Sequence, residues 1–203
     1  MSLFKRLLNL NYKSEEKAKR AKESEHGKYY PEEKLPIDEK FTHYFNKNGG
    51  KFLYCENMEE VLGAFDNILL ENDWYETDVC CFDKKLISRF DGFNLSFVKD
   101  GDASFFLCPC EALVSKNGSI LLSSNQIKEK SLKELPFNFI VFATTSQLVE
   151  SISEGLRKIK NQSARNIPSN ITAIKDFETE KEKDFMSYGS STKNLYLLLL
   201  EDL

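Results

Sequence analysis

The chain has 203 residues, the size of one ordinary domain or of one domain with a tail, and its 41% hydrophobic content is enough for a buried core. Asp and Glu (32) outnumber Lys and Arg (28), so the net charge of −4 argues against the broad basic surface that nucleic-acid binding requires. The longest strongly apolar run, 195–200, has six residues, whereas a membrane helix needs about 20, so we expect no membrane span.

The N-terminus and the cysteines indicate a reduced, cytoplasmic protein without a metal of its own. Lys5 and Arg6 interrupt the stretch that would be apolar in a signal peptide, so we expect a cytoplasmic location. The five cysteines form no CxxC pair, and the chain has only two His. We therefore expect buried, reduced thiols, no metal site and no cofactor held by this chain. The cysteines are Cys55, Cys80, Cys81, Cys108 and Cys110.

Residues 1–34 are predicted to be a flexible basic N-terminal arm. Residues 1–30 carry eight Lys and Arg against four Glu, which is a net +4 and leaves −8 for the rest of the chain. Residues 11–28 have almost no apolar side chain to bury, so we expect them to be mobile or a solvated helix. Four apolar residues form one stripe of a short helix that would dock on the domain, on a partner or on a membrane surface. They are Leu3, Phe4, Leu7 and Leu8.

From residue 35 onward, helical periodicity alternates with short β-rich runs. This pattern predicts an α/β domain over 35–203, with a mostly parallel sheet flanked by helices. Asp38 is expected to cap a first helix, and Asn57 with Glu60 to cap a second. The last strand is apolar on both faces and is therefore expected inside the sheet. Strands are expected at 51–55, 77–82, 94–98, 103–108, 119–123, 138–143, 171–174 and 195–200.

A second capping box, Thr144 with Gln147, predicts another helix that starts at this point. The helix is expected to bury its apolar stripe against the strands at 139–142 and 195–200. The residues of this stripe are Leu148, Ile152, Leu156 and Ile159.

Two glycine-containing turns are the candidate ligand site. The first is Lys116-Asn117-Gly118-Ser119, in which Asn-Gly on its pattern alone is more typical of a simple hairpin turn. The second comprises Tyr188, Gly189, Ser190, Ser191, Thr192 and Lys193, and loops of this composition are often plain connections. Bare glycine backbone, hydroxyls and ammonium groups, with Lys175 adding charge, would suit a small carboxylate or phosphate. We expect the two turns to lie close together at the same end of the sheet, because open α/β sheets bind ligands at the carboxyl ends of their strands.

Three segments between 110 and 159 stand in an order and spacing that match a known family. They are Glu111-Ala-Leu-Val-Ser-Lys-Asn-Gly-Ser-Ile-Leu-Leu, Leu135-Pro136 before Phe139-Ile-Val-Phe, and Ser146-Gln-Leu-Val-Glu-Ser-Ile. With them the chain resembles the LUD domain of lactate utilization protein C over about residues 35–203. The resemblance implies a fold similar to that of ribose-5-phosphate isomerases and CoA transferases.

The sequence departs from the family at its motifs. The family's acidic-Thr-Gly-Thr turn stands here as Lys116-Asn117-Gly118-Ser119, without the carboxylate. The Gly-Pro-Ser-Arg-Thr-Ala-Asp-Ile segment corresponds to Ile174-Lys175-Asp176-Phe177-Glu178, and His-Gly-Pro to Tyr188-Gly189-Ser190. CoA transferases carry a nucleophilic glutamate in a Ser-Glu-Asn-Gly turn, and Lys116 occupies that place here. Acyl transfer through a glutamyl intermediate is therefore not expected.

The resemblance implies an accessory role in lactate utilization, beside iron–sulfur subunits that oxidise L-lactate to pyruvate. The chain has no cluster motif, so any iron–sulfur clusters would belong to those partner subunits. Two alternatives stay open: a protein that binds a small carboxylate or phosphorylated ligand at the two turns, and a degenerate LUD domain that serves only protein contact.

Overall fold

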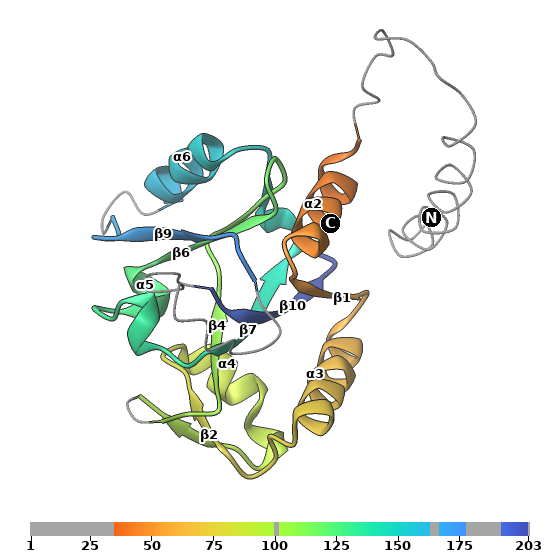
Figure 1. The fold of residues 1–203 in the computed structure, drawn as a ribbon, viewed down its shortest axis with the longest axis vertical. Helices are drawn as coiled ribbons and strands as arrows, with labels where there is room; N and C mark the ends of the chain where they lie inside the picture. The colour runs from red at the N-terminus through yellow and green to blue at the C-terminus, as the bar shows by residue number, and fades with distance from the viewer. Residues whose placement is uncertain (1–34, 100–101, 163–166, 178–191, 203) are drawn as a thin grey trace, which may run out of the picture.

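A computed structural model describes residues 35–99, 102–162, 167–177 and 192–202, which form two sheets with helices on both sides (Figure 1). The predicted arm, 1–34, lies outside the described residues. Sheet A is wholly parallel, in the order β1-β10-β7-β4-β2-β3. Its strands are β1 (Lys51–Cys55), β2 (Asp78–Cys80), β3 (Ser96–Val98), β4 (Phe105–Pro109), β7 (Asn138–Thr144) and β10 (Asn194–Leu200).

Sheet B has the order β8-β5-β6-β9 and mixed direction, since β6 runs antiparallel to both of its neighbours. Its strands are β5 (Ala112–Val114), β6 (Ser119–Ser123), β8 (Leu148–Val149) and β9 (Ile171–Ile174). The expected α/β fold with a mostly parallel sheet flanked by helices is confirmed. The second sheet is not anticipated by the sequence, because β5 and β8 are too short to give a pattern of their own.

The α-helices are α2 (Ile37–Lys47), α3 (Met58–Asn72), α4 (Lys84–Arg89), α5 (Ser124–Ile127) and α6 (Ile152–Gln162). Short 3₁₀ turns are η1 (Asp91–Phe93), η2 (Leu132–Glu134) and η3 (Thr145–Gln147). Among the helices of the described ranges, none is both long and apolar enough to cross a membrane.

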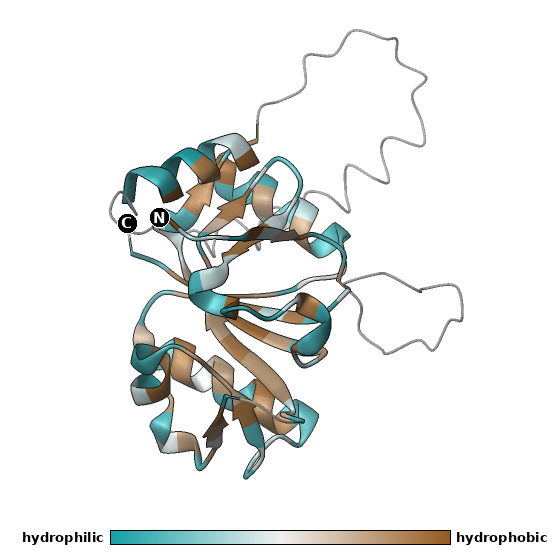
Figure 2. Ribbon diagram, turned by 90° about the vertical axis from the view of Figure 1, so that its left-hand side faces the viewer, coloured by the Kyte–Doolittle hydropathy of each residue, from teal (hydrophilic) through white to brown (hydrophobic). Residues whose placement is uncertain are grey.

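The core is layered around sheet A, whose strands show as the apolar centre of Figure 2. Along β10, Leu195 and Leu197 pack toward α2 and sheet B, whereas Tyr196 and Leu198 pack toward α3 and α4. Successive side chains of a strand point to opposite faces, so an apolar run on both faces requires cover on both sides. The predicted interior position of this strand is confirmed, since β10 lies between β1 and β7.

The helix predicted from the Thr144 capping box begins later than expected. The box is formed, but it opens η3 instead of a helix. The chain then adds β8 to sheet B, and α6 starts at Ile152. Ile152 and Leu156 are 39% and 41% exposed, so their predicted burial is wrong. The reason is that α6 turns Gly155 toward sheet B, where a Cβ would lie 2.7 Å from a Leu121 methyl.

The two N-terminal caps have different outcomes. Asn57 caps α3, accepting a 3.0 Å hydrogen bond from the Glu60 backbone N–H, as predicted. Asp38 does not cap α2: the N-cap is Pro36, and Asp38 lies in the first helical turn. All five cysteines are buried and none forms a disulfide, which confirms the prediction of reduced thiols.

Candidate functional site

The first predicted turn is the hairpin between β5 and β6. Gly118 has a φ of +67°, and a Cβ there would lie 2.4 Å from the Phe45 nitrogen and 2.5 Å from the Tyr44 carbonyl carbon. The bare glycine backbone therefore lets the hairpin approach α2, which is a packing role.

The polar groups of this turn are bonded within the protein. The Asn117 Oδ1 accepts from the Ser119 N–H (3.2 Å) and hydroxyl (2.8 Å). The Asn117 carbonyl accepts from Asn48 Nδ2 (2.8 Å), and the Gly118 N–H donates to the Val114 carbonyl (2.9 Å). These groups complete a hairpin turn and do not form a row of unpaired N–H donors.

Lys193, from the second predicted turn, lies at the amino end of β10 and is only 5% exposed. Its Nζ donates to the carbonyls of Leu135 (3.0 Å) and Pro136 (2.9 Å) and lies 5.1 Å from the centre of the Phe139 ring. The expectation of a place at the carboxyl end is wrong for Lys193, because the residue precedes the strand instead of following it.

The structure links the two turns through α2 and the segment after β9. The Asn48 carbonyl accepts from the Phe177 N–H (3.0 Å), and Phe177 forms a parallel bridge with Lys193. Lys116 and Lys175 are exposed. Thr192 lies directly before Lys193, while residues 188–191, with Tyr188, Gly189, Ser190 and Ser191, lie outside the described residues. Anion binding by this set stays a prediction.

A polar cluster that the sequence analysis did not single out lies at the carboxyl edge of sheet A, where the six parallel strands end. The Asp202 carboxylate, just after β10, accepts from the Thr145 hydroxyl (2.9 Å), the Ser146 N–H (2.8 Å) and the Ser146 hydroxyl (2.7 Å). Lys158 donates from α6 to the Ser146 carbonyl (2.5 Å). Hydroxyl residues after β7 and carboxylates after its neighbour β10 were the available signal, since adjacent parallel strands end at one edge.

The hydrogen bonds of this cluster determine the protonation state of the Asp202 carboxyl group. Burial raises the pKa of Asp202, but hydrogen bonds from Ser146, Thr144 and Thr145 outweigh burial and hold the pKa below its usual value. The carboxylate is therefore ionised at neutral pH, and its oxygens accept the hydrogen bonds that hold η3. Its role is to position the turn that leads from sheet A into sheet B.

Four of the five cysteine thiols are protonated at neutral pH. Burial raises the pKa of Cys55 and Cys81 to about 11, and it raises the pKa of Cys108 and Cys110 as well. A neutral buried thiol is a poor nucleophile and a poor metal ligand. Within the described residues, no group of three or more His, Cys, Asp or Glu is arranged to hold a metal ion.

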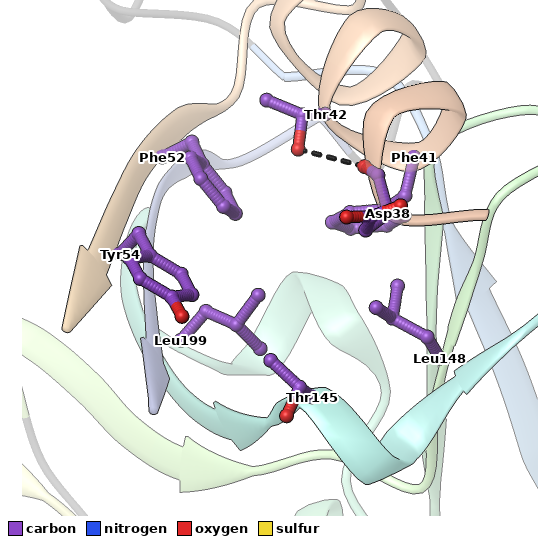
Figure 3. Close-up of a pocket in the computed structure, with 8 residues that line it drawn as sticks. All are labelled: Asp38, Phe41, Thr42, Phe52, Tyr54, Thr145, Leu148 and Leu199. Carbon is purple, nitrogen blue, oxygen red and sulfur yellow. Dashed lines mark hydrogen bonds between the residues drawn. The ribbon is translucent and has the colours of Figure 1, made fainter. Parts of the chain in front are cut away.

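An apolar hollow lies beside the carboxyl-edge cluster (Figure 3). Its empty volume is about 240 Å³ when the open solvent at its mouth is included, and its enclosed part has room for about one water molecule. The enclosed part of the hollow is therefore too small to hold a substrate. The hollow is lined by Asp38, Phe41, Thr42, Phe52, Tyr54, Thr145, Leu148 and Leu199.

Comparison with known proteins identifies a family and a solved structure that this chain resembles. The model of the LUD domain family matches residues 97–199, about half of the chain and most of both sheets. A crystal structure of a DUF162 family protein from Deinococcus radiodurans superposes with a TM-score of 0.56 at 14% identity, covering 82% of this chain and 96% of that one. This likeness shows the fold. No curated protein matches the sequence.

Proposed function

The chain belongs to the LUD domain family, and from that premise we propose that it is an accessory protein of lactate utilization in the cytoplasm. It would act beside iron–sulfur subunits that oxidise L-lactate to pyruvate, with the clusters held by those partners. The family match over residues 97–199 carries this proposal, because the family is associated with lactate utilization.

The chemistry of the described side chains supports an accessory role. The buried thiols of Cys55, Cys81, Cys108 and Cys110 are protonated. The Asp202 carboxylate is held by hydroxyls and an N–H of η3. Lys116 replaces the acidic residue at the family's turn, and that turn is bonded to α2. These groups organise the fold, so we propose that the chain contributes by contact with its partners and not by a nucleophile of its own.

A deletion strain of the organism that encodes this chain tests the proposal. We expect extracts of the deletion strain to lose oxidation of L-lactate to pyruvate with an artificial electron acceptor, and the restored gene to recover it. The tagged chain should co-purify with iron–sulfur proteins from lactate-grown cells. Unchanged lactate oxidation together with no iron–sulfur protein in the purified fraction would overturn the proposal.

Small-anion binding is the second candidate, because the ammonium groups of Lys116 and Lys175 are exposed. Thermal unfolding with lactate, pyruvate, CoA and sugar phosphates tests it, since a ligand that binds only the folded state adds about 2.7 kcal/mol at one hundred times its Kd. Lys116→Ala should weaken any stabilisation that is seen. A stabilisation unaffected by Lys116→Ala would place the ligand elsewhere.

A further inference from the structure

We propose that the hollow at the carboxyl edge of sheet A is the docking site of the chain's own N-terminal segment. The apolar residues between 3 and 8 would cover the hollow, and the basic residues of the arm would face the acidic residues that line or adjoin it. This interaction is independent of the proposed role in lactate utilization.

The hollow offers an open apolar surface. Its floor is formed by side chains of β1, α2, β8 and β10, among them Phe41, Tyr54 and Leu199 (Figure 3). Leu35 and Ile37, where the chain enters α2, are 44% and 41% exposed. The enclosed part of the hollow has room for about one water molecule, so it is too small for a separate ligand.

Three acidic residues belong to the hollow or adjoin it. Asp38 is one of its lining residues. Glu201 accepts a hydrogen bond from the Tyr54 hydroxyl, and Asp202 accepts one from the Thr145 hydroxyl, so both acids adjoin lining residues. Lys158 is also near, but its ammonium donates to the Ser146 carbonyl. An apolar surface beside acids suits an amphipathic segment with basic residues.

The N-terminal segment has this chemistry, and the chain places it nearby. Leu3, Phe4, Leu7 and Leu8 are apolar residues at a spacing that would place them on one face of a helix. Residues 1–30 carry a net +4, against −8 for the rest of the chain. The arm joins the described structure at residue 35, three residues before Asp38 at the hollow. A tethered segment has an effective concentration in the millimolar range, so weak contacts are enough for docking in cis.

Zero-length carbodiimide cross-linking of the full chain, followed by mass spectrometry, tests this proposal. The reagent joins ammonium and carboxylate groups that are in contact. We expect arm lysines to be joined to Asp38, Glu201 or Asp202 in the monomer fraction. Asp38→Lys should lower the total yield of these cross-links about two- to fivefold, the effect of losing an exposed charge pair. Glu129→Lys should leave the yield unchanged, because Glu129 is an exposed residue that follows α5, and α5 lies apart from α2 in Figure 1.

A second variant separates apolar docking from charge attraction alone. Phe4→Ser with Leu7→Ser keeps every charge, and it should lower the same cross-links at least as much as Asp38→Lys does. Hydrogen exchange of residues 3–8 should accelerate in parallel, and the melting temperature checks that both variants stay folded. Cross-links found only in dimers would assign the hollow to a second copy. Three outcomes would overturn the proposal. They are cross-links found only in dimers, equal yields of arm cross-links to the three acids at the hollow and to Glu129, and the absence of any cross-link to the arm.

Discussion

Sheet A and sheet B differ in how completely they are covered. Sheet A has α3 and α4 on one face and sheet B with α2 on the other, so β10 is buried on both sides. Sheet B has sheet A on one face and α6 on the other, and Ile152 and Leu156 on α6 remain partly exposed. An apolar strand inside a sheet is buried whichever way its side chains point, whereas the burial of a helical stripe depends on what that helix meets.

The largest difference between the two sheets is expected from truncation of a core residue. Leu197→Ala should reduce the free energy of unfolding by about 2–5 kcal/mol, because Leu197 is fully buried in β10. Ile152→Ala on α6 should cost about 1 kcal/mol or less, because its side chain is 39% exposed. Urea denaturation measures both. Equal losses would show that the outer layer is packed as tightly as the core of sheet A.

A glycine pair tests the packing of the sheet B hairpin against α2. Gly118→Ala should destabilise the protein by about 2–4 kcal/mol, because it places a Cβ against the backbone of Phe45 at a positive φ. Gly63→Ala, in the interior of α3, meets nothing within 4 Å and should stabilise by up to about 1 kcal/mol through helix propensity. Thermal and urea unfolding measure the stability of both variants. A small loss of stability for Gly118→Ala would mean that the hairpin can move away from α2 at little cost.

Substitution of two lysines compares a buried side chain at the start of β10, Lys193, with an exposed side chain on the hairpin of sheet B, Lys116. Lys193→Met should cost about 1–3 kcal/mol, because the carbonyls of Leu135 and Pro136 lose their donor. Lys116→Met should change the free energy of unfolding by less than about 0.5 kcal/mol, because Lys116 is exposed. If both variants were equally stable, the Lys193 ammonium would not be holding the Leu-Pro segment.

The smallest change in stability is expected from substitution of Asp202, which joins the end of sheet A to the turn that enters sheet B. The folded-state pKa of Asp202 lies below its ordinary value of 3.8, so its stabilisation is present above that value and is lost as pH falls through the folded pKa. Asp202→Asn should therefore cost about 0.5 kcal/mol at pH 7, as for an exposed charge, and less and less below about pH 4. Urea titrations at several pH values measure this; a difference that persists to pH 2 would contradict it.

The sequence by itself determined most of the strands and one helix cap. The bounds predicted for β1, β6 and β9 agree with the structure, because each is a short apolar run ended by turn-forming residues. The local capping pair of Asn57 and Glu60 is likewise present, since a cap depends only on residues three apart. The family was also legible, because the order of its framework segments lies along the chain.

Tertiary structure alone decided where these pieces go. The expected helix start at Thr144 gave way to η3 and β8, because pairing with β5 satisfies the backbone in a second sheet. The Asn117 turn is bonded to α2, and Lys193 to the Leu-Pro carbonyls, because both meet groups about 60–70 residues away in sequence. Asp202, Thr145 and Ser146 come together only because β7 and β10 are parallel neighbours that end at one edge. Spacing along a chain carries local geometry, whereas contacts between distant segments depend on how the sheets are ordered and covered.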